Sequence, residues 1–392
     1  MNDDGIVIAG GGLAAQRCCE RLRARGYEGP LRVVCDEGVA PYDRPPLSKE
    51  VLAGERDSDA LAFKPAQWYG DKGVELLLGE RAVSLDPEAH RLELRSGAAL
   101  RYEQLLIATG SRPRRLPAAE RFSNAHMLRT AADARALRGA IGEGCRLAII
   151  GAGFIGQEVA ATARKLGAQV TIVEAAPTPL VGILGARIGA WFAQLHRAEG
   201  VEVLCSAQLA DLHGNGRVEQ LTLADGRSID CDALVVGIGV EPAADWVAGS
   251  GLEPDGIHTD SAGRTALPGV YAAGDVARPL DQRSGQRVRT EHWEAASRQG
   301  QAVALAMLGE DPPLAPLPSF WSDQYGLRIQ YVGDARAADD ITIDGDQDAR
   351  DFSVRFCQGD RLVAALLVGR PGELPVLRRE IESHYEPMRS AA

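Results

Sequence analysis

The sequence lacks the features that mark membrane, nucleic-acid-binding and disulfide-stapled proteins. No apolar run is long enough to cross a bilayer, and the excess of 54 acidic over 43 basic residues disfavours a nucleic-acid or membrane surface. The seven cysteines are odd in number and none are spaced as Cys-x-x-Cys, which is typical of a reducing compartment without structural zinc. The acidic start runs directly into a predicted strand. We therefore expect no signal peptide, a cytoplasmic location, no membrane or nucleic-acid partner and no bound metal ion.

The same glycine-rich turn occurs twice in the chain. The first is Gly10–Ala15 (GGGLAA) and the second is Gly151–Gly156 (GAGFIG). Each follows a short apolar run that predicts a strand, and each opens a predicted helix. A second predicted strand then leads to an acid, Asp36 in the first unit and Glu174 in the second, about 20 residues beyond the turn. The predicted strands are Ile6–Ala9, Leu31–Cys35, Leu147–Ile150 and Gln169–Val173. Two such units predict two bound dinucleotides, and holding two commonly serves to pass electrons between them.

These turns have the residue types that a pyrophosphate site needs. The first glycine permits a tight turn, the second lets the backbone approach the pyrophosphate, and a small third residue (Ala15 or Gly156) lets helix and strand pack closely. The acid accepts hydrogen bonds from ribose hydroxyls, and Glu174 would repel a 2′-phosphate, which favours NADH over NADPH. A doubly wound fold that binds nothing at these turns is the alternative. The candidate contacts are Gly10, Gly12, Leu13, Ala14 and Ala15 in the first turn, and Gly151, Gly153, Phe154, Ile155 and Gly156 in the second.

The length of 392 residues predicts two or three domains. We expect an α/β fold with two doubly wound, Rossmann-like nucleotide-binding domains and a small α+β domain at the C-terminus. The second glycine unit is predicted to be inserted into the first domain, because the strand that ends at Gly274-Asp275 returns to that domain. Three consecutive domains are the alternative. The segment Arg112–Pro117 is predicted to be a linker, and helices are predicted over 294–308 and 374–383.

In its motifs the sequence resembles the FAD-containing, NADH-dependent ferredoxin reductases of the glutathione-reductase structural class. The likeness is strongest to the reductase components of bacterial aromatic-ring dioxygenase systems of the biphenyl and toluene type, with putidaredoxin reductase and apoptosis-inducing factor more distant. It covers nearly the whole chain. The stretches that carry it are Pro41–Lys49, Ala108–Gly110, Leu128–Thr130, Gly151–Glu158, Val235–Val240, Tyr271–Val276, Glu291–Trp293 and Phe320–Gln324.

The resemblance implies a division into domains and a set of cofactor contacts. Residues 1–115 and 243–318 would form the FAD-binding domain, 116–242 the NAD-binding domain, and 319–392 a domain that covers the flavin. Asp36 would bind the adenosine ribose, Val83 would meet the adenine through its backbone, and Asp275 would hold a ribityl hydroxyl. Arg44 and Arg129 would neutralise the phosphates or brace the cofactor. Further implied contacts are Pro45, Ala108, Thr109, Gly110, Gly274, Glu291, His292 and Trp293 for FAD, and Gly237, Ile238 and Gly239 for NADH.

Three residues are candidates for the chemistry itself. Lys49 would lie near the reacting face of the flavin and raise its electron affinity, although most lysines are solvated. Glu158 would contact the nicotinamide side of NADH, although an acid also suits the start of a helix. Trp321 would flank the flavin ring and provide an electron exit, although it could equally anchor the C-terminal domain. His292 is expected to be a hydrogen-bonded structural residue.

The resemblance implies an enzyme, a ferredoxin–NAD(+) reductase. It would take a hydride from NADH onto FAD and pass electrons singly to a [2Fe–2S] ferredoxin, of Rieske type or of plant or putidaredoxin type, that supplies an aromatic-ring dioxygenase. A ferredoxin that serves a cytochrome P450, and a non-catalytic flavoprotein that binds partners, are the alternatives. A disulfide reductase is disfavoured, because the segment Glu37–Glu80 contains no cysteine. A monomer and a homodimer are both open.

Two surfaces are less well defined by the sequence. Family members often carry arginines after the acid of the second unit, where this chain has Thr178 and Gly182, so we expect a weaker hold on the adenosine end of NADH. The acidic run Asp334–Asp351 is expected to be a solvated loop. A ferredoxin, commonly acidic, is expected to dock on basic patches such as Arg112-Arg114-Arg115 or Arg378-Arg379.

Overall fold

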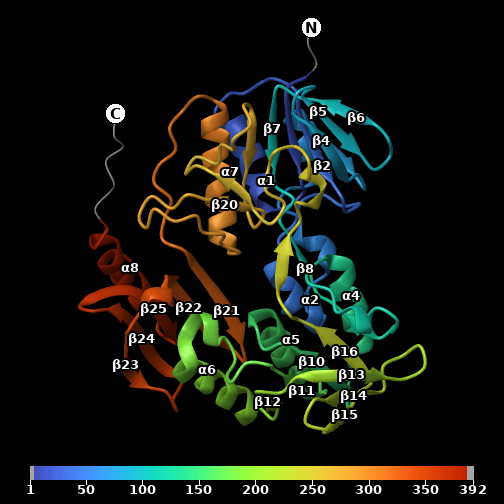
Figure 1. The fold of residues 1–392 in the computed structure, drawn as a ribbon, viewed down its shortest axis with the longest axis vertical. Coiled ribbons are helices and arrows are strands. Elements are labelled where there is room, and N and C mark those ends of the chain that lie inside the picture. Colours follow the sequence, from blue (N-terminus) through green and yellow to red (C-terminus); the bar gives the residue numbers. More distant parts are fainter. Residues whose placement is uncertain (1–3, 386–392) are drawn as a thin grey trace.

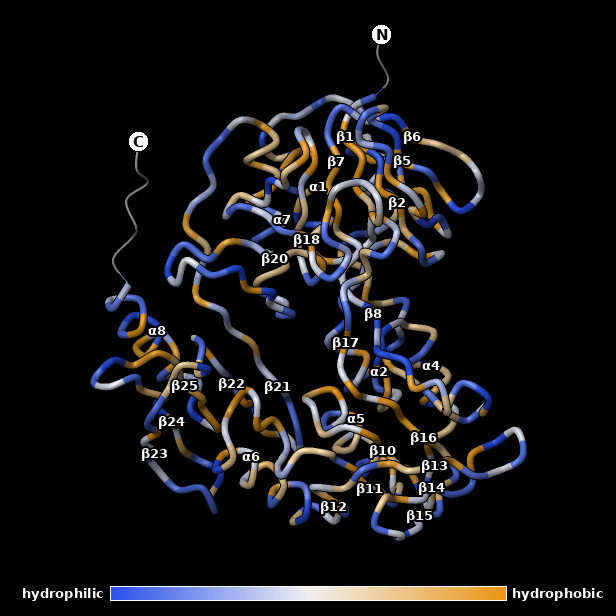
Figure 2. The backbone as a smooth tube through the Cα atoms, in the orientation of Figure 1, coloured by the Kyte–Doolittle hydropathy of each residue, from blue (hydrophilic) through white to orange (hydrophobic). Residues whose placement is uncertain are grey.

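The first glycine unit lies in a five-stranded parallel sheet in the order β19-β7-β1-β2-β3. The structure, a computed structural model, describes residues 4–385 (Figure 1). The strands are apolar and buried, as sheets covered on both faces require, and Figure 2 shows β1 and β7 as hydrophobic. Helices α1 (Leu13–Ala24) and α7 (Trp293–Met307) pack side by side on it. The strands are β1 Ile6–Ala9, β2 Leu31–Cys35, β3 Val74–Leu78, β7 Gln104–Ile107 and β19 Val270–Ala272.

The second glycine unit lies in another five-stranded parallel sheet, in the order β12-β11-β10-β16-β9. Helices α4 (Ala131–Ala140), α5 (Phe154–Lys165) and α6 (Val181–Ala198) belong to this unit. A three-stranded antiparallel sheet, β13-β14-β15, packs beside it. The strands are β9 Ala125–His126, β10 Arg146–Ile150, β11 Gln169–Val173, β12 Glu202–Leu204, β13 Leu209–His213, β14 Gln220–Leu223, β15 Ser228–Asp230 and β16 Ala233–Val236.

The C-terminal unit is a five-stranded antiparallel sheet in the order β21-β22-β25-β24-β23. One face packs on α6 of the second unit through a cluster that includes Trp191, Phe192 and Phe352. The other face is covered by α8 (Leu374–Ser383) through Leu377 and Ile381. The C-terminal unit is therefore fixed to the second unit rather than tethered (Figure 1). The strands are β21 Ser319–Gln324, β22 Leu327–Gly333, β23 Asp340–Asp346, β24 Asp351–Gln358 and β25 Arg361–Val368.

Two sequence predictions need correction. The first two residues of the predicted linker, Arg112 and Pro113, belong to β8 (Ser111–Pro113), which pairs with β17 (Val240–Pro242), because the chain crosses between the two nucleotide units twice and the crossings satisfy each other's backbone groups. The acidic run is not a single loop, because its middle part forms β23 (Asp340–Asp346), an edge strand that turns exposed acids outward. No helix among residues 4–385 is both long and apolar enough to cross a membrane.

Short elements complete the two nucleotide units and connect the sheets. The antiparallel sheet β4-β5-β6 lies beside the first unit, and β18 pairs with β20. The proline-rich segment forms a 3-10 turn over Pro45–Ser48 that leads into α2. These elements are β4 Ala82–Asp86, β5 Arg91–Leu94, β6 Ala99–Arg101, β18 Ile257–Thr259, β20 Ala277–Pro279, α2 Glu50–Ala53 and α3 Ala66–Asp71.

Candidate functional site

In the first glycine turn, close contacts require glycine at two positions, and a third position has free space beside it. Gly10 has φ +121°, and a Cβ there would lie 2.2 Å from the Ala108 carbonyl oxygen. A Cβ on Gly11 would lie 2.7 Å from Cys35 Sγ. A Cβ on Gly12 would meet no atom of the described chain within 4 Å. Gly12 directly precedes α1, so its open side faces the helix start, where an anion is favoured, and the turn fits a pyrophosphate.

The second glycine turn repeats this pattern. Gly151 has φ +99°, and a Cβ there would lie 2.3 Å from the Gly237 carbonyl oxygen. A Cβ on Gly156 would lie 2.4 Å from the Gly151 carbonyl oxygen, as close helix–strand packing demands. Gly153, which precedes α5, would place a Cβ in space that the described residues leave empty within 4 Å. Ile238 and Gly239 follow Gly237 at the same sheet edge, so the predicted second contacts lie together.

The two acids have different surroundings. Asp36 is 43% exposed and pairs with Arg81 and with Arg95, whose Nη1 lies 3.6 Å from its Oδ1. The Glu174 carboxylate accepts the backbone N–H groups of Ala152 and Ala176 at 2.7 Å each, so it also braces the second glycine turn. Both units also carry large apolar side chains that are exposed and could flank a flat base. They are Val39, Leu78 and Val83 in the first unit, and Ile155, Ile183 and Ile238 in the second.

Asp275 lies at the centre of the predicted flavin contacts. Its Oδ2 accepts the Ser111 hydroxyl at 2.7 Å and Arg129 Nη2 at 3.1 Å. Arg44 donates to the Arg129 carbonyl at 2.7 Å and to Glu37 at 2.7 Å, so it braces the segment that carries Arg129. Arg44 therefore holds the position of Arg129, and its expected role toward the cofactor stays a prediction.

The remaining predicted contacts follow the strand ends of the first sheet. Thr109 follows β7 and donates its hydroxyl to the Ala243 carbonyl at 2.7 Å. Gly110 and Gly274 have φ of +69° and +80°, which favour glycine. A Cβ on Gly274 would lie 3.4 Å from Ala14 Cβ. The predicted FAD contacts thus gather at the carboxyl edge of the sheet, where ligands bind in open α/β folds.

Glu158 is the point at which the three units meet. Its carboxylate is 4% exposed and pairs with Lys49 Nζ at 2.7 Å. The hydroxyl of Ser48 donates to Oε2 at 2.5 Å, and the hydroxyl of Ser322 donates to Oε1 at 2.7 Å. Lys49 is 14% exposed, so it is not a solvated surface lysine. The sequence alone does not predict Ser48 and Ser322 as site residues. Ser48 lies in the motif Pro41–Lys49, and Ser322 lies in the motif Phe320–Gln324.

The aromatic residues near the start of α7 form a second group. The rings of Trp293 and Trp321 are 6.0 Å apart at 66°, and Trp293 Nε1 donates to Asp43 at 2.8 Å. His292 differs from the expectation of a hydrogen-bonded residue, because its Nδ1 is buried without a partner among residues 4–385 and its ring lies against Phe320. Burial lowers the pKa of His292 to about 4, so the ring is neutral near pH 7. Burial also raises the pKa of Glu291, which pairs with Arg289 at 2.6 Å.

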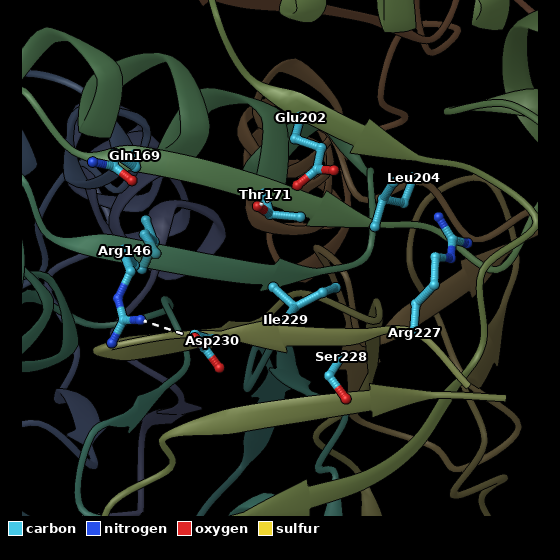
Figure 3. A pocket seen from close by; sticks show the side chains of 10 residues that line it. Arg146, Gln169, Thr171, Glu202, Leu204, Arg227, Ser228, Ile229 and Asp230 are labelled. Carbon is cyan, nitrogen blue, oxygen red and sulfur yellow. Dashed lines mark hydrogen bonds and ion pairs between the residues drawn. The ribbon is translucent and has the colours of Figure 1, made fainter. Parts of the chain in front are cut away.

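A cavity of about 380 Å³ in the second unit is a different feature (Figure 3). It lies between strands β10, β11 and β12 and strand β15. Its lining residues lie along these strands, from Arg146 at the start of β10 to Leu204 at the end of β12, and none of them belongs to the glycine turn. Arg146 is already paired with Asp230 and Asp232. The cavity is therefore not the predicted nucleotide site.

The chain has two glycine turns of the dinucleotide-binding type, and the buried ion pair of Lys49 with Glu158 joins the two units that carry them. These features define a pyridine-nucleotide oxidoreductase. Residues 4–300 match the family model of the pyridine nucleotide-disulphide oxidoreductases, and residues 319–392 match that of the reductase C-terminal domain. The chain belongs to this family and, within it, to the ferredoxin–NAD(+) reductases.

Relatives and solved structures agree over nearly the full length. The chain is 42% identical to the biphenyl dioxygenase system ferredoxin–NAD(+) reductase component of Paraburkholderia xenovorans, over 88% of this chain and 84% of that protein. It is 38% identical to the anthranilate 1,2-dioxygenase system reductase component of Burkholderia cepacia, over 99% and 96%. The structure of a covalent putidaredoxin reductase–putidaredoxin complex matches with a TM-score of 0.94 at 34% identity, over 98% of this chain and 94% of that chain. The predicted family, fold class, enzyme class and cofactors FAD and NADH are confirmed.

The two open glycine positions allow the cofactor sites to be tested separately. Gly12→Ala is expected to fold but to lose most of its FAD, because the new methyl group meets only the space that the pyrophosphate needs. Gly153→Ala is expected to keep FAD and to bind NADH about tenfold or more weakly. Flavin absorbance after purification and NADH titration measure the two effects. Equal flavin content in wild type and Gly12→Ala would contradict the first assignment.

Proposed function

We propose that this reductase takes a hydride from NADH onto FAD and passes the electrons singly to a [2Fe–2S] ferredoxin that supplies an aromatic-ring dioxygenase. The observation that carries the proposal is the Glu158 carboxylate, which joins Lys49 of the first unit to Ser322 of the C-terminal unit. The segment Glu37–Glu80, which supplies Lys49, contains no cysteine to receive the electrons. The electrons therefore leave the chain for an external acceptor.

The division into domains and the location belong to the same proposal. Strand β19, residues 270–272, lies in the first sheet, which supports an FAD-binding domain of residues 1–115 and 243–318 interrupted by an NAD-binding domain of 116–242. Residues 319–392 would then be the domain that covers the flavin. We place the reductase in the cytoplasm, in keeping with seven cysteines that are all free thiols.

The chain's own residues would favour the reaction in two ways. FAD, when bound, supplies a two-electron acceptor that can release its electrons one at a time. Glu158 is locked by three donors and can orient the nicotinamide, and such positioning contributes up to about 7–11 kcal/mol of a barrier. Lys49 pairs with this carboxylate and holds it in place, and its ammonium group would favour the negative charge that a flavin gains on accepting a hydride. The first N–H groups of α7, with the positive end of the helix dipole, can stabilise a developing negative charge.

A groove beside Trp321 is the proposed ferredoxin site. It has a volume of about 510 Å³ and lies on α1 and α7. Its arginines are Arg17, Arg21 and Arg298, and its acids Glu20 and Glu294 are paired with Arg17 and Arg378. The surface is thus basic around two tryptophans and suits an acidic partner. The basic patches expected from the sequence are less suitable, since Arg112 is paired with Glu241 and Asp245, and Arg115 with Glu120.

The NADH site is proposed to hold the adenosine end loosely. Thr178 Oγ1 is buried without a hydrogen-bond partner among the described residues. A Cβ on Gly189 would lie 2.5 Å from it, so Thr178 faces α6. Gly182 is exposed and has no side chain to offer. This supports the expectation that Glu174 sets the preference for NADH with little help from neighbouring cations.

Glu158→Gln tests the assigned role of the carboxylate. The amide keeps the shape but loses the charge paired with Lys49, so reduction of the bound flavin by NADH is expected to slow about 10- to 100-fold. Reduction by dithionite should not change. Glu55→Gln is the matched control, because Glu55 forms an exposed ion pair with Lys165 between the same two units. A stopped-flow rate for Glu158→Gln equal to that of Glu55→Gln would refute the role.

The class of ferredoxin is tested by mixing the purified reductase with NADH and either a dioxygenase-type or a putidaredoxin-type [2Fe–2S] ferredoxin. We expect a higher kcat/KM with the dioxygenase-type protein, because the identity to the biphenyl system component, 42%, exceeds the 35% to putidaredoxin reductase of Pseudomonas putida. A clear preference for the putidaredoxin type would favour the cytochrome P450 alternative.

Charge reversal in the groove tests the docking site. Arg298→Glu is expected to lower kcat/KM for ferredoxin by about tenfold or more at low salt and to weaken its dependence on ionic strength. Ferricyanide reduction should stay constant, since a small dye needs no docking surface. Arg115→Glu, a change at a 71% exposed arginine on another unit, is the control. Equal losses in both variants would exclude the groove as the site.

A further inference from the structure

A line of buried hydrogen bonds leads away from Glu158 on the side opposite Lys49. Ser322, which donates to Glu158, accepts Gln324 Nε2 at 3.1 Å. Gln324 Oε1 lies 3.1 Å from His196 Nε2, and His196 Nδ1 lies 2.7 Å from the hydroxyl of Tyr325. Ser322, Gln324 and His196 are each at most 1% exposed. The line therefore joins α6 of the second unit to β21 of the C-terminal unit away from solvent.

The direction of every bond in this line is determined. Gln157 Nε2 donates to the Ala152 carbonyl at 2.8 Å, and Gln324 Nε2 donates to Ser322, so both amide oxygens face His196 Nε2. Amide oxygens only accept, so Nε2 carries the proton and Nδ1 accepts from Tyr325. Burial lowers the pKa of His196 to about 4, which keeps the ring neutral near pH 7. Each donor thus points from Tyr325 toward the Glu158 carboxylate.

The backbone at Tyr325 is strained. Tyr325 has φ +52° and Gly326 has φ +76°, in a two-residue turn between β21 and β22. Such turns favour asparagine or glycine at the first position, and a bulky residue there costs about 1–2 kcal/mol. The strained residue is held by its hydroxyl on His196 and by its ring, which lies 5.2 Å from the imidazole. Strain that the surroundings maintain in this way points to a role for the side chain.

Three parts of the site converge on His196. Through Gln157 it reaches Ala152 in the second glycine turn, and through Gln324 and Ser322 it reaches Glu158. Ser322 is next to Trp321 on β21, so the same line fixes the strand that carries this tryptophan. Removal of the Tyr325 hydroxyl would release the turn and let strand β21 move relative to α5 and α6.

We propose that His196 and Tyr325 are positioning residues that lock the C-terminal unit onto the NAD-binding unit and set the orientation of the Glu158 carboxylate. They contact neither nucleotide turn directly and act through Ser322. The proposal rests on the role in hydride transfer that is proposed above for Glu158.

Tyr325→Phe removes the hydroxyl and keeps the ring. We expect flavin reduction by NADH to slow about tenfold, because a small displacement of a positioning group has effects of this size. Amide hydrogen exchange over 319–324 should be faster, with unchanged flavin content. Tyr331→Phe is the control, since it removes a buried hydroxyl from the same sheet that accepts the Ala335 N–H at 2.8 Å and does not lead to Glu158. It should leave the rate unchanged.

A double-mutant cycle separates this role from a general loss of stability. If Tyr325 acts through Ser322, then Ser322→Ala combined with Tyr325→Phe should slow flavin reduction no more than the stronger single change. Additive losses, a Tyr325→Phe rate within about twofold of wild type, or an equal loss in Tyr331→Phe would overturn the proposal. If NADH fails to reduce the wild-type flavin, the proposed function is wrong, and hydrogen exchange over 319–324 alone decides whether the lock exists.

Discussion

The structure depends on one buried carboxylate. Glu158 is held by donors from two other units, Lys49 and Ser48 on one side and Ser322 on the other. A buried charge is tolerated only when it is paired and hydrogen-bonded, and removing one partner of such a pair costs about 3–5 kcal/mol. The relative placement of the three units therefore depends on the same carboxylate that is proposed to contact the nicotinamide. Packing alone would fix the units less specifically.

Close backbone contacts and side-chain hydrogen bonds position helix α7 and the two glycine turns. A Cβ on Gly300 would lie 2.2 Å from the Ala14 carbonyl oxygen, so α7 can approach α1 only because this residue is glycine. That contact sets the start of α7, and with it Trp293, relative to the first glycine turn. In the second unit, Glu174 braces Ala152, and Gln157 holds the same residue from the other side. The second nucleotide turn is thus held by side chains as well as by strand geometry, whereas the first is held by close backbone contact with α7.

Much of this architecture could be predicted from the sequence, because its signals are local. The strands Ile6–Ala9, Leu31–Cys35 and Gln169–Val173 and the helix Leu374–Ser383 have the predicted bounds, since their apolar patterns are continuous and are bounded by turns. The partners Ser48, Ser322, His196 and Tyr325 could not be predicted in the same way. They meet only after separate units pack together, and nothing in their local sequence indicates a shared network. The pairing of β8 with β17 escaped prediction for the same reason.

If the two nucleotide sites are arranged as proposed, NADH reduces the bound flavin directly. Anaerobic mixing with NADH, followed by addition of a [2Fe–2S] ferredoxin, tests this arrangement through the absorbance of the bound flavin. We expect rapid bleaching of the flavin band and its recovery as the ferredoxin is reduced. A protein that binds FAD and NADH but shows no bleaching would contradict it.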